Sequence, residues 1–218
     1  MEPFAVKDCA LIAIATGKKA QNLKELRDGL LTVPLDCIYY HFWGGLLHSR
    51  FEEPEYNNDF AAFAAHVLHD QTLAERLAVL DPIHFDTMDA LKAELIDLID
   101  TRLDEIREPA WVDPENQFHF VRSQIVVFDT NKRFDRPSDL AKFLSQATPS
   151  SIFYHFIDAR RRLLEGIDDF RLWLQGIEEG DWGQLIEALK AIDPYFIPLL
   201  ALRDQIAQVF ADHCSKEV

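Results

Sequence analysis

The chain has 218 residues, with 22 Lys and Arg against 37 Asp and Glu, so its formal net charge is −15. Hydrophobic residues make up 48% and charged residues 27%, a composition typical of a globular chain long enough to bury a core without disulfides or metals. Such an acidic chain has no electrostatic attraction to nucleic-acid phosphates or to an anionic membrane surface. Nucleic acid and membrane are therefore excluded as bulk partners.

The N-terminal segment and the cysteines bear on the compartment. No window approaches the ~20 apolar residues of a membrane span, and the first residues lack the basic and apolar regions of a signal peptide. Cys9, Cys37 and Cys214 are odd in number and form no CxxC pair, which is typical of reduced thiols. We expect a cytoplasmic protein in which Cys9, within an apolar run, is a small buried hydrophobic residue.

A segment near the start of the chain is repeated further along it. Residues 4–42 align without gaps on residues 118–156, at a constant shift of 114. The identities are Phe4/Phe118, Thr16/Thr130, Lys18/Lys132, Leu26/Leu140, Leu30/Leu144, Ile38/Ile152, Tyr40/Tyr154, His41/His155 and Phe42/Phe156. After small changes of shift, Asp59-Phe60 aligns on Asp169-Phe170. This order predicts a duplication of about half the chain rather than a solenoid, whose units are shorter.

The repeat begins with a strand in each copy. Residues 9–15 are ambiguous, but their counterparts 124–129 are β-branched and aromatic, which favours a strand for both. We expect each strand to end in a polar, basic turn, at residues 16–19 and 130–133. A helix is expected directly after each turn, and helix N-termini favour anions. The basic side chains of the turns therefore favour binding of an anionic ligand there.

Helices are predicted after each strand. The first helix of each copy carries the apolar residues Leu23, Leu26 and Leu30 or Leu140, Phe143 and Leu144. The next begins after Pro34 or Pro149, with Asp36 or Ser150 as N-cap.

Asp residues mark the later helices of each copy. Helices are expected to begin near Asp59 and Asp169. Asp81-Pro82 and Asp193-Pro194 are typical of an N-cap followed by a first-turn proline, and they predict the start of each copy's last helix. The prolines in residues 108–116 indicate a linker.

These signals predict an α+β fold that is predominantly helical. It consists of two pseudo-equivalent halves, each with one short strand followed by about five helices. The expected boundaries are 1–107 for the first repeat, 108–116 for the linker and 117–218 for the second repeat, and the halves can pack as one compact domain.

The shared Tyr-His-Phe triplet is the most specific signal of the repeat. His41 and His155 lie on apolar helix faces beside Tyr40 and Tyr154. One interpretation is a buried histidine whose ring nitrogens are satisfied by backbone or a carboxylate. The other places both histidines and tyrosines around a shared cleft, as ligand contacts or general acid–base groups.

A second cluster of polar residues occurs in the first half alone. His66, His69 and Asp70 fall at i, i+3 and i+4, so one helical face could present them to a metal. The pattern matches no established zinc signature, and a solvated face is the alternative, so we expect neither a metal nor a cofactor. Arg50, in an acidic loop, is a further ligand candidate.

The halves differ after the shared His-Phe. The first copy continues with Gly44-Gly45, and glycine costs about 1 kcal/mol relative to alanine inside a helix, so a close backbone approach or a kink is expected there. The second copy has Arg160, Arg161 and Arg162, which could clamp a phosphate or carboxylate or could pair with nearby acids.

Several stretches together resemble a known family. DCALIAIATGKKAQNL (8–23), YYHFW (39–43), EYNNDFA (55–61) and SIFYHFIDARRR (151–162) are similar to an uncharacterised bacterial and archaeal family of unknown function, sometimes associated with glycosyltransferase genes. The resemblance covers nearly the whole chain. It implies a prokaryotic cytoplasmic protein and a loose link to carbohydrate metabolism, and it implies no activity or catalytic residues.

Two hypotheses for function follow. The sequence contains no P-loop, GxGxxG, GxSxG or paired CxxC, which favours a non-catalytic binding or accessory module. Its ligand would be an anionic small molecule or a partner enzyme, and a homodimer is one option for its assembly. The alternative is a hydrolase or transferase that uses His41 or the histidine and acid cluster of the first half, with or without a metal.

Overall fold

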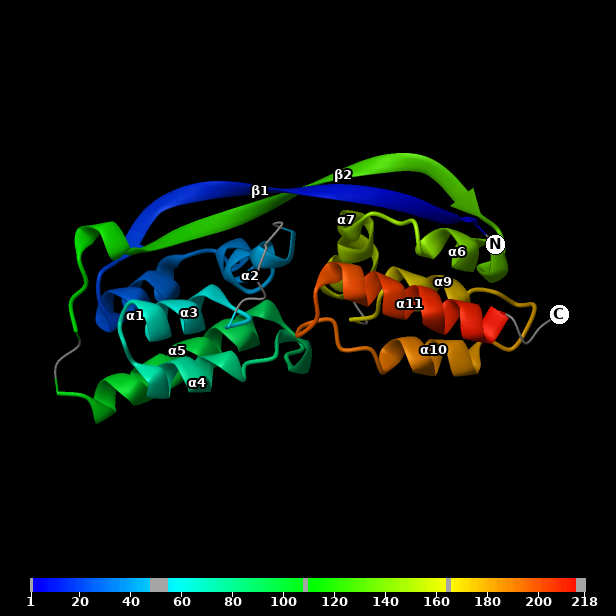
Figure 1. Cartoon of the computed structure of the whole chain (residues 1–218). Helices are drawn as coiled ribbons and strands as arrows, with labels where there is room; N and C mark the ends of the chain where they lie inside the picture. Colours follow the sequence, from blue (N-terminus) through cyan, green and yellow to red (C-terminus); the bar gives the residue numbers. More distant parts are fainter. Residues whose placement is uncertain (1, 48–54, 108–109, 164–165, 215–218) are drawn as a thin grey trace. The chain divides into compact units, whose positions relative to one another are not determined.

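The computed structural model describes residues 2–47, 55–107, 110–163 and 166–214. The chain is α+β and mostly helical, as the sequence predicted, with a two-stranded sheet formed by β1 (Phe4–Ala20) and β2 (Phe118–Phe134). The Thr16 hydroxyl donates to the Phe120 carbonyl, and the Thr130 hydroxyl donates to the Val6 carbonyl. As residue numbers rise along β1 they fall along β2, so the strands are antiparallel, as Figure 1 shows.

The strands are much longer than predicted. Each has 17 residues and continues through the basic segment where a turn was expected. The reason is a local backbone change: Gly17 and Asn131 adopt φ values of +77° and +59° inside their strands. Glycine and asparagine tolerate this left-handed conformation, which bends a strand without ending it. The basic residues therefore do not lie at helix N-termini.

Helices follow each strand. After β1 come α1 (Leu23–Thr32), α2 (Leu35–Trp43), α3 (Asp59–His66), α4 (Gln71–Ala78) and α5 (Met88–Glu105). After β2 come α6 (Pro137–Leu144), α7 (Pro149–Ile152), α8 (Ala159–Arg162), α9 (Asp169–Gln175), α10 (Gly183–Lys190) and α11 (Leu199–Cys214). A π-helical turn, Phe153–Asp158, joins α7 to α8, and short 3₁₀ turns occupy Gly44–Leu47, Pro82–His84 and Pro114–Asn116.

Some helix starts agree with the sequence and others correct it. Asn58 and Asp168 cap α3 and α9 through their side chains, close to the predicted starts. Pro34 and Thr148 precede α2 and α7, so Asp36 and Ser150 are not N-caps, because each lies inside the first turn. Asp81 caps the 3₁₀ turn Pro82–His84, and α5 begins later, after Thr87. α11 likewise begins at Leu199, beyond the Asp193-Pro194 pair.

The residues group into two compact units. Unit 1 comprises Met1–Ala10 and Ile125–Val218, and unit 2 comprises Leu11–Gln124. Each strand therefore begins in one unit and ends in the other. The division into 1–107 and 117–218 stays a prediction, and the units are described below by their own bounds.

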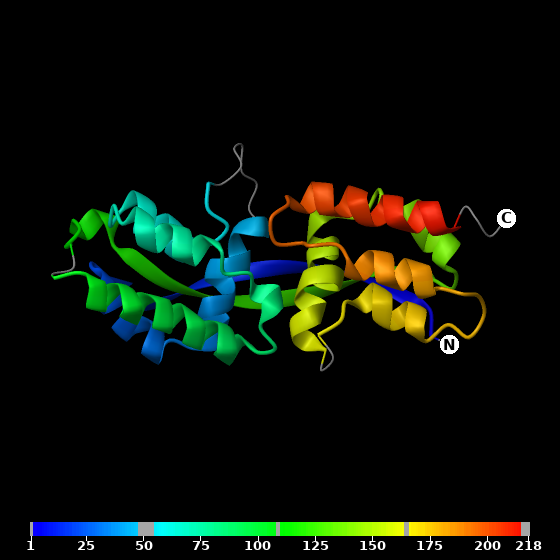
Figure 2. The ribbon, with the colours of Figure 1, turned by 90° about the horizontal axis from the view of Figure 1, so that it is seen from below.

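Each unit buries its own apolar core. In unit 2, α3 packs on α4 and α1 on α5, and the core includes Leu26, Phe60 and Leu95. In unit 1, α11 packs on α6 and α10, and Figure 2 shows α10 and α11 side by side. Helix α5 contributes Leu91, Leu95 and Ile99 to the core of unit 2. No helix of the described ranges is both long and apolar enough to cross a bilayer.

Candidate functional site: two histidine clamps on the strands

His41 fixes the beginning of β2 in unit 2. It lies on α2, where its side chain is 4% exposed. Its Nδ1 is 2.9 Å from Oδ2 of Asp59 on α3, and its Nε2 is 3.1 Å from the main-chain nitrogen of Val121, which donates the hydrogen bond. An N–H donor at Nε2 and a carboxylate at Nδ1 together require the neutral tautomer with its proton on Nδ1. We name this arrangement the His41 clamp.

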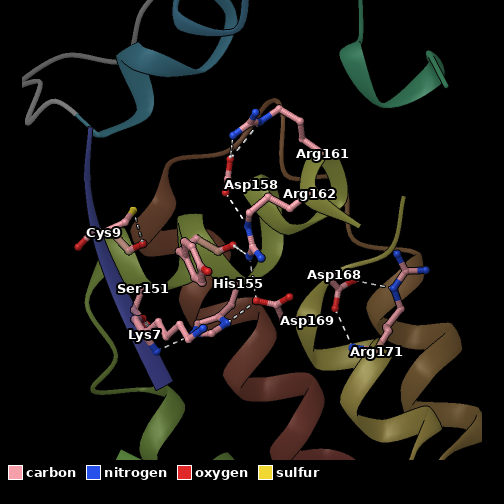
Figure 3. A network of polar contacts seen from close by, with 12 residues as sticks. Lys7, Cys9, Ser151, His155, Asp158, Arg161, Arg162, Asp168, Asp169 and Arg171 are labelled. Carbon is pink, nitrogen blue, oxygen red and sulfur yellow. Dashed lines mark hydrogen bonds and ion pairs between the residues drawn. The ribbon is translucent and has the colours of Figure 1, made fainter. Parts of the chain in front are cut away.

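His155 fixes the beginning of β1 in unit 1 in the same way. The main-chain nitrogen of Lys7 donates to its Nε2 at 2.8 Å, and its Nδ1 is 2.7 Å from Oδ2 of Asp169 (Figure 3). Lys7 and Val121 are 114 residues apart, as are the two histidines, so the same hydrogen bond recurs at matched positions. We name this arrangement the His155 clamp.

Aromatic rings surround both histidines in matched geometry. In unit 1, Phe4 lies 4.9 Å from the His155 ring and stacks on Phe170 at 5.1 Å between centroids. In unit 2, Phe118 lies 4.7 Å from the His41 ring and stacks on Phe60 at 5.3 Å. Edge contacts complete each set, from Trp173 to Phe4 and from Phe63 to Phe118. Each histidine is therefore enclosed in an apolar aromatic cluster.

The prediction of a buried, satisfied histidine thus describes both His41 and His155. Each ring uses one nitrogen on a strand N–H and the other on a carboxylate. A general base needs a ring nitrogen within hydrogen-bond reach of its substrate. In this structure both nitrogens of each ring are already engaged by the fold.

The three consecutive arginines form a charge network on the His155 clamp. Asp158 is 1% exposed and accepts bonds from Arg161 Nη2 at 2.9 Å and Arg162 Nε at 2.7 Å. Arg162 also donates to Asp169 Oδ2 at 3.0 Å, which links this network to His155 (Figure 3). The arginines therefore contact acids, one of the two alternatives that the sequence left open.

Asp168 forms a second centre in the same unit. Its carboxylate is fully buried, caps α9 and accepts from Arg171 Nε at 2.6 Å. Arg160 approaches it at 4.0 Å and lies over the Phe156 ring. The π-helical turn Phe153–Asp158 is the local backbone feature that precedes these arginines, and π-helical turns occur frequently at functional sites.

The tyrosines beside the histidines differ in their surroundings. Tyr154 is buried under the Arg162 guanidinium, which lies 4.0 Å from the ring centroid, and burial raises the pKa of its hydroxyl. Tyr40 lies against Gly44, where an added Cβ would sit 2.8 Å from the tyrosine ring. This contact is the close approach that the Gly44-Gly45 pair predicted.

The histidine and acid cluster of the first half does not share one helical face. Helix α3 ends at His66, and His69 has a φ of +54° in the connection to α4. Asp70 caps α4 and pairs with Arg102 at 2.8 Å. The prediction of three residues on one face is wrong, because the helix ends before His69. Within the described ranges, no group of three or more His, Cys, Asp or Glu side chains is placed to hold a metal. Arg50 lies outside the described residues.

The basic strand segments and the thiols also have structural roles. Lys18 donates to the carbonyl and hydroxyl of Thr32 at the end of α1, and Lys132 lies over the Phe143 ring. Burial is the main cause that raises the pKa of Cys9 and of Cys37 to about 12. Neither thiol is an activated nucleophile at neutral pH.

Sequence reasoning missed how the clamps are built. It aligned Asp59 with Asp169 and His41 with His155, but it did not pair each acid with its histidine. The joint recurrence of both pairs was the available signal. The strand N–H donors at residues 7 and 121 had no such signal, because a main-chain group has no side-chain identity.

Comparisons with known proteins place the chain in a family. A solved structure titled "The structure of OrfY from Thermoproteus tenax" matches with a TM-score of 0.83 and 25% identity, over 98% of this chain and 96% of that chain. No curated protein matches the chain. The model of a family of unknown function, DUF5752, matches residues 1–211, so the chain belongs to this family, as the resemblance predicted.

Proposed function

We propose that the chain is a non-catalytic binding or accessory module whose ligand is a partner protein. The observation that carries this proposal is that the side chains best suited to catalysis hold the fold. Both clamp histidines are engaged at both ring nitrogens. Cys9 and Cys37 are buried thiols with raised pKa values.

Exposed apolar side chains supply the contact surface for such a partner. Aromatic residues are enriched at protein interfaces and often dominate binding. The large apolar side chains exposed in the described residues are Ile12, Leu31, Val79, Ile83, Trp111, Val127, Phe128, Leu172, Phe196 and Leu200. Trp111 is 69% exposed and Phe196 is 58% exposed. The net charge of −15 favours a partner with a neutral or basic surface.

The test first identifies the partner and then measures its affinity for wild type and for variants of the chain. Light scattering of the purified chain shows whether the partner is a second copy. Otherwise the partner is captured with the tagged chain, purified, and titrated against wild type, Trp111→Ala, Phe196→Ala and the exposed acidic control Asp97→Asn. We expect one aromatic variant to weaken binding at least tenfold, with the control unchanged. Equal affinities for all four proteins would refute an apolar interface at these residues.

An anionic small molecule is the second candidate ligand. The observation that favours it is a local cluster of four arginines in unit 1, where Arg160, Arg161, Arg162 and Arg171 approach Asp158, Asp168 and Asp169. A thermal-shift series with inorganic phosphate and sugar phosphates tests it on wild type, Arg161→Gln and the control Arg203→Gln. Stabilisation lost only in Arg161→Gln supports this candidate, and the absence of any shift in wild type overturns it.

The remaining expectations from the sequence stay proposals. A cytoplasmic location follows from the cysteine pattern, and a link to carbohydrate metabolism from the resemblance. A hydrolase or transferase centred on His41 is the less favoured alternative, because the fold uses both nitrogens of that ring. Two duplicated halves are supported by the two matched clamp contacts, because the N–H donors Lys7 and Val121 lie 114 positions apart, as do the histidines that accept from them.

A further inference from the structure

The beginnings of the two strands are held through a common six-residue pattern. The segments are residues 4–9 of β1, in unit 1, and residues 118–123 of β2, in unit 2. The first position is Phe4 or Phe118, buried at 5% and 6% exposure among the clamp's aromatic rings. The fourth position donates its main-chain N–H to the clamp histidine. We name the helical residues that contact each segment its cradle.

The sixth position repeats a further hydrogen bond. The Cys9 thiol donates to the Ser150 carbonyl at 3.3 Å, and the Ser123 hydroxyl donates to the Asp36 carbonyl at 3.3 Å. The two donors are 114 residues apart, and so are the two acceptors. Each cradle therefore offers a carbonyl to the side-chain donor at this position, which is a thiol in unit 1 and a hydroxyl in unit 2.

The third position distinguishes the cradles. It is Val6 in unit 1 and the larger Phe120 in unit 2, and both side chains are almost fully buried. A Cβ added to Gly29 would lie 2.4 Å from the Phe120 ring, so the absence of a side chain on α1 makes room for that ring. The residue matched to Gly29 in the other copy is Phe143. The unit 2 cradle is therefore shaped for an aromatic third residue.

We propose that each cradle is a binding site for an extended peptide segment, recognised by pattern and not by its covalent connection to the chain. The ligand has an aromatic first residue, an apolar third residue, a free main-chain N–H at the fourth and a hydroxyl or thiol at the sixth. The size of the third residue selects the cradle. Residues 4–9 are the ligand of unit 1, and residues 118–123 are the ligand of unit 2.

A replacement in the full chain tests recognition by pattern. Residues 4–9 are replaced by FHVVRS, which is the 118–123 segment with valine kept at the third position. We expect the Tm to stay within about 3 °C of wild type and the amide of residue 7 to stay protected from hydrogen exchange. The matched control, HFVVRS, has the same composition but moves the phenylalanine to the opposite side of the strand. It should lower the Tm by about 8 °C or more.

Binding in trans is tested with a synthetic peptide of residues 2–12. It is added to full-length Phe4→Ala, whose own segment is weakened. We expect saturable binding, detected by fluorescence anisotropy of the labelled peptide, and a rise in the Tm of the variant. Wild type should bind at least tenfold more weakly, because its own segment occupies the cradle. A peptide in which Phe4 and Ala5 are exchanged should not bind.

The two experiments fail in different ways. If FHVVRS lowers the Tm as much as HFVVRS does, the cradle does not recognise the pattern, and the proposal is overturned. The replacement decides this point even if Phe4→Ala does not fold. If Phe4→Ala folds and does not bind the peptide of residues 2–12, recognition requires the covalent connection, and the proposal is overturned.

Discussion

The His155 clamp is joined to arginines, whereas the His41 clamp ends at a carboxylate that faces solvent. Asp169 is 18% exposed and contacts Arg162, which continues to the buried Asp158. Asp59 is 42% exposed and, within the described ranges, contacts no arginine. The two units thus hold a strand by the same hydrogen bonds in different electrostatic surroundings. The shared hydrogen bonds hold a strand in both units, and the arginine network is what distinguishes the His155 clamp from the His41 clamp.

The largest loss of stability is expected when the phenylalanine at the first position of either strand segment is removed. Phe4→Ala and Phe118→Ala should each lower the free energy of unfolding by about 3–5 kcal/mol, because both rings are buried among other aromatic rings. Urea denaturation followed by circular dichroism measures both. Phe128→Ala, on an exposed ring of β2, is the control and should change stability by less than about 0.5 kcal/mol. A loss below about 1 kcal/mol at Phe4 or Phe118 would contradict the anchor role.

The next largest effect concerns the third strand position, where Phe120 in unit 2 replaces the Val6 of unit 1. Gly29→Ala should cost about 1–3 kcal/mol, because the new Cβ collides with the Phe120 ring. In a Phe120→Val background the same substitution should be neutral or stabilising, since alanine is the better helix former by about 1 kcal/mol. A double-mutant cycle measures this coupling. An equal cost in both backgrounds would show that the ring does not need the glycine.

A smaller loss of stability is expected from neutralising the clamp carboxylates, and it should differ between the two clamps. Asp169→Asn should lower the free energy of unfolding by about 1–2 kcal/mol, because it removes the charge that pairs with Arg162. Asp59→Asn should cost less than about 0.5 kcal/mol, since the amide oxygen still accepts from His41 and the group is half in solvent. Denaturation of the two variants side by side is the measurement. Equal losses would mean that the arginine network adds nothing to the clamp.

Some features of the fold could be predicted from the sequence and others could not. The strand and helix order and the mostly helical class followed from hydrophobic pattern and from the repeat, and burial of the two histidines was one of the two interpretations that the sequence left open. The strand lengths did not, because the polar segments at Gly17 and Asn131 are typical of turns, and only the partner strand continues them as sheet. Tertiary pairing overrode a local signal there.

The clamp partners were harder to predict for a different reason. Each histidine pairs with an acid 18 or 14 residues away and with a main-chain N–H that is 80 or 148 residues away. Such distances depend on packing and not on spacing within one helix. The opposite error occurred at His66, His69 and Asp70, where regular spacing predicted a shared helical face although the helix ends at His66.

The smallest change in stability is expected from Cys9→Ser, which gives both strands a serine at the sixth position. Cys9→Ser should change the free energy of unfolding at pH 7 by less than about 1 kcal/mol, because the hydroxyl can donate to the Ser150 carbonyl as Ser123 does to Asp36. Burial raises the pKa of the Cys9 thiol from 9.0 to about 12, so the native state keeps a proton that the unfolded chain loses above pH 9. The thiol's contribution is therefore complete below pH 9 and decreases as the pH rises towards 12. Urea denaturation at pH 7 and pH 10.5 should show a larger alkaline loss for wild type than for Cys9→Ser. Equal alkaline losses, or rapid labelling of Cys9 in the folded chain at pH 8, would contradict a buried neutral thiol that donates to the cradle.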